Sequence, residues 1–232
     1  MEELLPTVIT GPRDLNAGVL FGGAGISTAG LRKYFNVLVN VEYWDVAANI
    51  YRANYPKSKV IERDIRTLTA DEILDVFIED QKELDLLQIS DPCVEKSITG
   101  MQRIWHATND LGIVGLKLAI DTNVKAILCE QVPALTHENL AVLWSMTLAV
   151  IERYAGNYNV DAWILNSHNY GDCTSRKRLF IQLIRKDIGF PRWPQPVELS
   201  KRGTISKFLP DVDYVVDSNF IESSSHPTTH FH

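Results

Sequence analysis

Two side chains that could do chemistry follow predicted strands of this chain. Cys93 comes directly after Pro92, a few residues beyond the apolar run 84–89, and Glu130 directly follows the apolar run 126–129. An exposed, ionised thiol is a nucleophile, and a well-placed carboxyl group can transfer a proton. The polar residues around Cys93 favour exposure over burial as an inert core cysteine. Glu130 could instead cap the helix that follows it, so the sequence alone leaves both interpretations of this acid open.

A glycine-rich turn is a second candidate for function. Gly23 and Gly25 follow the predicted strand 19–21. Glycine at such a place lets the backbone turn sharply and approach a ligand closely. The match to the dinucleotide-binding pattern GxGxxG is partial, because Thr28 takes the third glycine position. The turn is therefore either part of a nucleotide site or a simple strand-to-helix connection.

Two acids at further strand ends favour the nucleotide site. Glu42 ends the second predicted strand, where a carboxylate can bind ribose hydroxyls. Asp64 and Ile65 follow the third strand, where an acid can meet the amino group of an adenine. Three consecutive strand ends in this order predict a site for S-adenosylmethionine, and the alternative for each acid is a solvated strand end.

Basic residues gather in the segment 171–210, which has nine lysines and arginines but three acids. Arg176 and Arg178 have alternate spacing, so they are expected on one face of the strand that begins there. The whole chain has a net charge of −6, which is unexpected for a protein that binds nucleic acid. A basic segment on an acidic body predicts a local phosphate-binding face. The alternative is a solvated basic surface.

Four short patches, in this order along the chain, resemble the cytosine-C5 DNA methyltransferase family. They are Phe-Gly-Gly-Ala-Gly at 21–25, Asp-Pro-Cys at 91–93, Glu-Gln-Val at 130–132 and Thr-Ser-Arg-Lys-Arg at 174–178. The resemblance implies a Rossmann-like fold that binds S-adenosylmethionine. It also implies methyl transfer to C5 of a cytosine flipped out of DNA, because C5 and C6 cannot be reached inside the base stack.

The resemblance gives each candidate residue a role in that reaction. Cys93 would attack C6 of cytosine, and Glu130 would hold and protonate N3. Arg178 would bind O2 or the phosphate of the target cytosine, and Arg176 would orient the loop that carries Glu130. The cofactor residues would be the strand-end set together with an aromatic ring against the adenosyl group and the proline of the catalytic loop. They are Phe21, Gly23, Gly25, Glu42, Asp64, Ile65 and Pro92.

Three interpretations of the function remain open at the level of sequence. The first is a DNA cytosine-5 methyltransferase, and the second is an RNA cytosine methyltransferase or an enzyme that attaches another one-carbon-derived group to C5. The third is a non-catalytic subunit of the same fold that binds nucleic acid or a partner chain. Departures from the family pattern at Val19, Val94 and Lys96 favour the third interpretation. The presence of both Cys93 and Glu130 favours an enzyme.

Apolar runs that alternate with helical segments must position these residues. The sequence predicts strands at 19–21, 37–41, Lys59–Ile61, 84–89, 126–129, 161–165 and 179–184. It predicts helices at 26–35, Asp45–Asn54, 71–78 and 138–154, with Thr69 as a candidate cap. Strands separated by helices predict a doubly wound α/β fold with a mostly parallel sheet.

Length and composition set the remaining expectations. A chain of 232 residues can form one large domain, which we place at residues 1–210, with residues 211–232 as a tail or linker. A recognition domain is not visible in the sequence, so DNA and a second chain carrying that domain are the candidate partners. Three cysteines without CxxC spacing predict neither a zinc site nor a disulfide framework, and favour the cytoplasm. No apolar run approaches the length of a membrane span.

Overall fold

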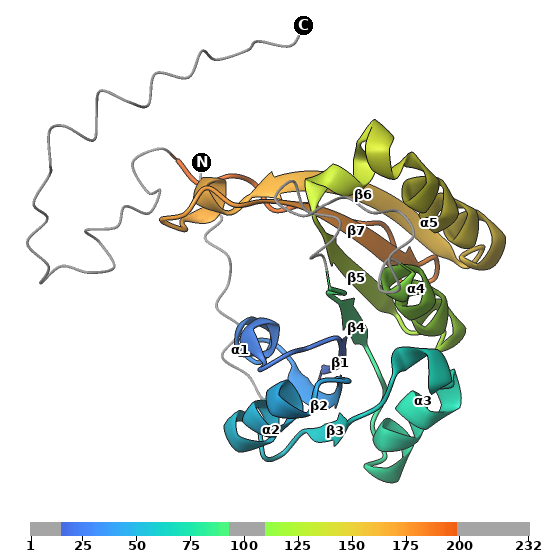
Figure 1. The fold of residues 1–232 in the computed structure, drawn as a ribbon. Helices are drawn as coiled ribbons and strands as arrows, with labels where there is room; N and C mark the ends of the chain where they lie inside the picture. The colour runs from blue at the N-terminus through green and yellow to red at the C-terminus, as the bar shows by residue number, and fades with distance from the viewer. Residues whose placement is uncertain (1–14, 93–109, 199–232) are drawn as a thin grey trace, which may run out of the picture. The chain divides into compact units, whose positions relative to one another are not determined.

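A single seven-stranded sheet organises residues 15–92 and 110–198, the parts of the chain that the computed structural model describes (Figure 1). The strand order is β3-β2-β1-β4-β5-β7-β6. The strands are β1 (Asn16–Leu20), β2 (Asn36–Val41), β3 (Lys59–Ile61), β4 (Leu86–Ile89), β5 (Ala126–Gln131), β6 (Tyr158–Asn166) and β7 (Lys177–Arg185). Strands β1 to β5 pair in parallel, whereas β7 runs antiparallel to both β5 and β6. The predicted α/β class with a mostly parallel sheet is confirmed.

Helices cover both faces of this sheet (Figure 1). Helices α1 (Ile26–Leu31) and α2 (Asp45–Asn54) lie on one face, and α3 (Ala70–Glu79), α4 (Leu111–Asp121) and α5 (Ala141–Tyr154) lie on the other. The larger apolar core lies under α3, α4 and α5 and includes Ile73, Leu116 and Leu143. Short 3₁₀ turns complete the described elements: η1 (Ile65–Thr67), η2 (Pro133–Thr136), η3 (Glu138–Leu140) and η4 (Ser167–Tyr170). None of the described helices is long and apolar enough to cross a membrane.

Local sequence signals account for several element boundaries. Helix α2 has the predicted bounds, and α3 begins at a capping box in which Thr69 and Glu72 each bind the other's backbone amide. The predicted helix 26–35 is shorter in the structure and ends at Leu31. The predicted helix 138–154 begins with η3 and continues as α5.

Helix α4 was missed by the sequence analysis. Its sequence is apolar all round and contains Gly112 and Gly115, which lower helix propensity. The structure gives Gly115 a packing reason, because a Cβ there would lie 2.9 Å from the ring of Phe21. Helix α4 is therefore stabilised by burial against the sheet rather than by local preference.

The described residues belong to two compact units. The first contains the sheet and its helices, with residues 15–92, 110–166 and 177–194. The second contains residues 167–176, which join β6 to β7, and 195–198. Within the second unit, Ser167 organises the turn: its amide donates to the Arg176 carbonyl at 3.0 Å, and its Oγ donates to the Thr174 carbonyl at 2.7 Å. The predicted boundary at residue 210 lies outside the described residues.

Because of Tyr158, the stability of the first unit depends on pH in the alkaline range. Its hydroxyl is buried and donates to the Val124 carbonyl at 2.8 Å, and burial raises the pKa of Tyr158 from 10.0 to about 12. The folded protein holds this proton where the unfolded chain has lost it. The contribution to stability is therefore full below pH 10 and is lost as the pH rises towards 12.

We expect Tyr158→Phe to lower the free energy of unfolding by about 1 kcal/mol at pH 7, because one buried hydrogen bond is lost. The variant should also lose less stability than the wild type between pH 10 and pH 12. Urea unfolding followed by circular dichroism measures both effects. Tyr154→Phe, at an exposed position of α5, is the matched control and should behave as the wild type does.

Candidate active site

The turn after β1 is held by side chains of the neighbouring strand β2. Phe21 and Gly23 have positive φ angles of 61° and 54°, so the backbone turns sharply as soon as β1 ends. The amide of Gly22 donates to Asn40 Oδ1 at 3.2 Å, and the amide of Gly23 donates to Glu42 Oε2 at 2.9 Å. A Cβ on Gly22 would collide with the Asn40 side chain. Asn40, which the sequence analysis did not single out, is thus part of the scaffold of the turn.

Gly25 joins this turn to helix α1. Its φ angle of 95° is in the left-handed region, and a side chain there would collide with the ring of Tyr55. The Tyr55 hydroxyl donates to the Gly25 carbonyl at 2.8 Å. The predicted glycines therefore serve a tight turn that is fixed from two directions, by β2 and by the end of α2.

Glu42 supports the turn and faces the cavity beside it. Its Oε2 accepts from the Gly23 amide and its Oε1 accepts from the Trp44 amide, each at 2.9 Å. A carboxylate has about four acceptor sites, so two remain for hydroxyl groups of a ligand. The geometry allows the predicted contact with ribose in addition to a structural role.

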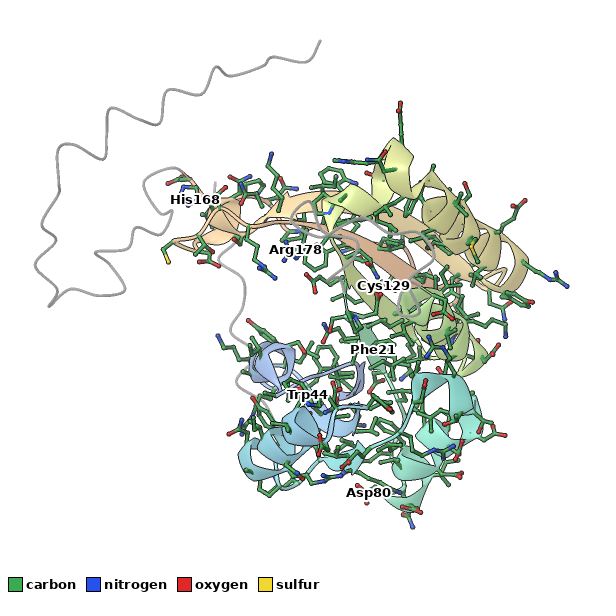
Figure 2. The ribbon with its side chains drawn as sticks, in the orientation of Figure 1. Phe21, Trp44, Asp80, Cys129, His168 and Arg178 are labelled. Atoms are coloured by element: carbon green, nitrogen blue, oxygen red, sulfur yellow. The ribbon has the colours of Figure 1, made fainter. Side chains whose placement is uncertain are left out.

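A cavity of about 660 Å³ opens at the carboxyl ends of β1 to β4. Parallel α/β sheets bind ligands at such an edge, where the strand order reverses between β1 and β4. Phe21, Trp44 and Ile50 supply apolar walls, and Glu42 and Asp64 supply carboxylates. Figure 2 labels Phe21, which directly follows β1, and Trp44, which is the N-cap of α2.

Trp44 is a lining residue that the sequence analysis missed. Its side chain is 62% exposed, although a tryptophan gains by burying its large ring. An aromatic residue two positions after a strand-end acid was the available sequence signal. An exposed indole on the wall of a cavity is suited to stacking against a planar ligand.

Asp64 and Ile65, which follow β3, also line the cavity. Asp64 caps η1 through a hydrogen bond from the Arg66 amide at 2.9 Å. Arg66 also pairs with Asp110, at the start of α4, at 2.8 Å, and this hydrogen bond raises the pKa of Arg66. Ile65 is 3% exposed and belongs to the larger core, so it forms the floor of the cavity rather than a projecting contact.

Glu130 and Arg178 form an ion pair near the carboxyl end of β5. Arg178 Nε lies 2.7 Å from Glu130 Oε1, and the two side chains are 18% and 29% exposed, respectively. The register of β5 with β7 places Glu130 opposite Phe180, so Arg178 is its diagonal neighbour on the same face. Figure 2 shows Arg178 on β7. A carboxyl group held by a guanidinium has a fixed direction, which a residue that binds one base edge requires.

The remaining predicted site residues are distributed differently. Pro92 is exposed and lines the cavity, whereas Cys93 lies outside the described residues. Arg176 belongs to the second unit, where its amide donates to Ser167 Oγ at 3.3 Å. The resemblance gave Arg176 the role of orienting the loop that carries Glu130, and this role stays a prediction. In the structure it is Arg178 that contacts the Glu130 side chain.

Known proteins identify the family to which these features belong. The sequence model of the C-5 cytosine-specific DNA methylase family matches residues 15–230. The chain belongs to this family. Members of the family use S-adenosylmethionine as the methyl donor.

Individual relatives agree with this assignment. The chain is 34% identical over 183 residues to the type II methyltransferase M.Sau96I of Staphylococcus aureus, covering 76% of this chain and 40% of that protein. It is 24% identical over 198 residues to M.XorII of Xanthomonas oryzae pv. oryzae, covering 84% of this chain and 46% of that protein. The chain thus spans about half or less of the length of these curated relatives.

Solved structures agree on the fold. A DNA modification methyltransferase encoded within an E. coli prophage superposes with a TM-score of 0.61 and 25% identity, over 79% of this chain and 52% of that one. A DNMT2 mutant of Spodoptera frugiperda superposes with a TM-score of 0.58 and 20% identity, over 79% and 54%. The second likeness shows the shared fold alone.

The cavity described above fits S-adenosylmethionine. Exposed Trp44 and the ring of Phe21 suit the flat adenine, and Glu42 suits the ribose hydroxyls. Glu42 and Asp64 also place two carboxylates in the cavity, which suits a cofactor that carries a net positive charge. The predicted cofactor residues Phe21, Gly23, Glu42, Asp64, Ile65 and Pro92 all line this cavity, and Gly25 lies behind it in the turn.

We expect Glu42→Ala to weaken binding of S-adenosylhomocysteine about 10- to 100-fold, because the ribose contact and the support of Gly23 are lost together. Isothermal titration calorimetry measures the change. Glu62→Ala is the matched control, since Glu62 follows the adjacent strand β3 but pairs with Arg52 on the surface. Equal affinity in Glu42→Ala and the wild type would remove Glu42 from the cofactor site.

Proposed function

We propose that this chain transfers a methyl group from S-adenosylmethionine to C5 of cytosine in DNA. The observation that carries the proposal is the Glu130–Arg178 ion pair, at the same edge of the sheet as the cofactor cavity. A cofactor cavity alone would suit many methyltransferases. An oriented carboxyl group at the same edge of the sheet suits a methyltransferase that must hold the N3 edge of a pyrimidine.

The proposed reaction uses three of the chain's own residues on a cytosine that has left the base stack. The Cys93 thiolate attacks C6 and forms a sulfur–carbon bond, while the protonated form of the Glu130 carboxyl group donates its proton to N3 and becomes the carboxylate that pairs with Arg178. Addition at C6 makes C5 nucleophilic, and the bound cofactor supplies an electrophilic methyl group. Loss of the C5 proton to a base then restores the C5–C6 double bond and releases the thiolate from C6, while N3 returns its proton to Glu130. Arg178 keeps the Glu130 carboxyl directed towards the base.

Sequence recognition is proposed to need a further segment, in the same chain or in a second chain. The short coverage of M.XorII and M.Sau96I supports this, because those proteins contain as much sequence again beyond the matched region. The chain covers 76% of a third relative, M.AquIA of Picosynechococcus, at 28% identity, so relatives differ in what accompanies this region. The division into a catalytic domain at 1–210 and a tail at 211–232 stays a prediction, as does a cytoplasmic location. The names of the relatives support a place in a type II restriction–modification system.

The test is methyl transfer from radiolabelled S-adenosylmethionine to DNA and to RNA of matched sequence. Label recovered as 5-methylcytosine in digested DNA would support the proposal. Label recovered only from RNA would favour an RNA methyltransferase. Cofactor binding without transfer to either polymer would favour a non-catalytic subunit.

A further inference from the structure

Asp91 and Gln131 are buried polar residues at the carboxyl ends of the adjacent strands β4 and β5. They are 6% and 7% exposed, and Gln131 Nε2 donates a hydrogen bond to Asp91 Oδ1. The register pairs Ile89 with Cys129, so Asp91 and Gln131 each lie two positions further on, on the same face of the sheet. Their hydrogen bond therefore links the strand ends beyond the last ladder pair.

The first turn of helix α4 packs closely against the Asp91 carboxylate. A Cβ on Gly112 would lie 2.6 Å from Asp91 Oδ1, so glycine is needed for the backbone to approach this closely. The first amides of a helix have no acceptors within the helix, and the helix dipole favours a negative charge there. Asp91 is thus held between α4 and the amide of Gln131.

The side-chain amide of Gln131 is oriented so that its donor is paired and its acceptor is not. An ionised carboxylate only accepts hydrogen bonds, so Nε2 faces Asp91. The Gln131 Oε1 atom is buried, and within the described part of the chain it has no hydrogen-bond partner. A buried acceptor without a partner is destabilising, and its retention calls for an explanation.

We propose that Asp91 and Gln131 form a positioning pair that sets the spacing of the two reacting groups. Asp91 precedes Pro92 and Cys93 in the sequence, and Gln131 follows Glu130. Adjacent residues of a strand face opposite ways, so Gln131 anchors β5 on the α4 side while Glu130 faces the other side. The pair ties the strand end that leads to the nucleophile to the strand end that carries the acid. This inference rests on the proposed roles of Cys93 and Glu130.

The experiment compares the rate at which Gln131→Met and the wild type form the covalent adduct with DNA that contains 5-fluorocytosine. Methionine keeps the volume of glutamine but cannot donate to Asp91. We expect the adduct to form about 100-fold more slowly, because a small displacement of reacting groups has an effect of that size. The KM for S-adenosylmethionine should stay within about twofold of the wild type, since the cofactor cavity is formed by other residues. Gln88→Met is the matched control, because Gln88 is also a buried glutamine of this sheet with a partnerless Oε1 among the described residues.

Two further measurements keep the inference open to refutation. Amide hydrogen exchange at residues 89–91 should be faster in Gln131→Met than in Gln88→Met. Asp91→Asn, which retains an acceptor for Gln131, should lose less activity and serves if Gln131→Met does not fold. The positioning role would be overturned if Gln131→Met formed the adduct at the wild-type rate. Unchanged amide hydrogen exchange at residues 89–91 would overturn it as well. If the wild type itself forms no adduct, the proposed function fails, and the exchange measurement alone decides whether the tie exists.

Discussion

Cys93→Ser is expected to abolish the covalent adduct between this protein and DNA containing 5-fluorocytosine. Fluorine at C5 cannot leave as a proton does, so the sulfur–carbon bond at C6 should persist in the wild type. A serine hydroxyl is a far weaker nucleophile than a thiolate, and the rate of methyl transfer should fall by at least about 1,000-fold. Denaturing gel electrophoresis detects the adduct, and the radiolabel assay measures the rate.

The adduct should also require cofactor, because methyl transfer at C5 precedes the step that fluorine blocks. Cys173→Ser is the control, since Cys173 is a partly exposed cysteine of the second unit without a proposed role in the reaction. Adduct formation that survives in Cys93→Ser would contradict the mechanism and favour a non-catalytic protein.

Arg178→Met is expected to lower kcat about 10- to 100-fold while S-adenosylmethionine binding is retained. The substitution removes the guanidinium that lies 2.7 Å from Glu130 and leaves a mostly buried carboxylate without this partner. The Glu130 carboxyl should then lose its fixed direction towards the base. Single-turnover methyl transfer measures the effect on chemistry, and calorimetry measures cofactor binding.

The strand that contains Arg178 supplies its own control. Arg185 ends β7 and pairs with Asp187 at 2.7 Å, but the Asp187 side chain is 61% exposed. Arg185 lies at the opposite end of β7 from Arg178, away from Glu130, so Arg185→Met should leave kcat unchanged. Arg178→Lys keeps the charge but loses the planar donor geometry of the guanidinium. Its kcat should lie between that of Arg178→Met and that of Arg185→Met. A kcat for Arg178→Met equal to that for Arg185→Met would show that the pair has no part in catalysis.

Both predictions bear on the departures from the family pattern at Val94 and Lys96. These residues lie outside the described part of the chain, next to Cys93. A loop that differs in sequence can still present a thiol if the strand ends on either side of it are fixed. The positioning pair of Asp91 and Gln131 offers one such support.

Much of the fold follows from local sequence. Alternation of apolar runs with helical segments predicted the strands of the sheet, and Thr69, the candidate cap, is the N-cap of α3, where it forms a capping box with Glu72. The strand-end positions of Gly23, Glu42 and Asp64 predicted that they meet at one edge, because the ends of parallel strands lie together. Each strand end and each helix cap depends on residues that are neighbours in the chain, so a sequence can specify it.

Helix α4 and the contacts around Glu130 were decided by tertiary structure. The glycines of α4 weaken it locally, and only the approach to Asp91 and Phe21 explains them. Arg176 and Arg178 alternate in the sequence, so the sequence does not distinguish between them as a partner for Glu130. The register of β7 against β5 determines that Arg178 contacts Glu130. The same holds for Asp91 and Gln131, which meet because β4 and β5 are adjacent. Register and burial arise between segments that are far apart in the chain. Residue types and spacing therefore indicated the candidate site residues, whereas packing determined which of them are in contact.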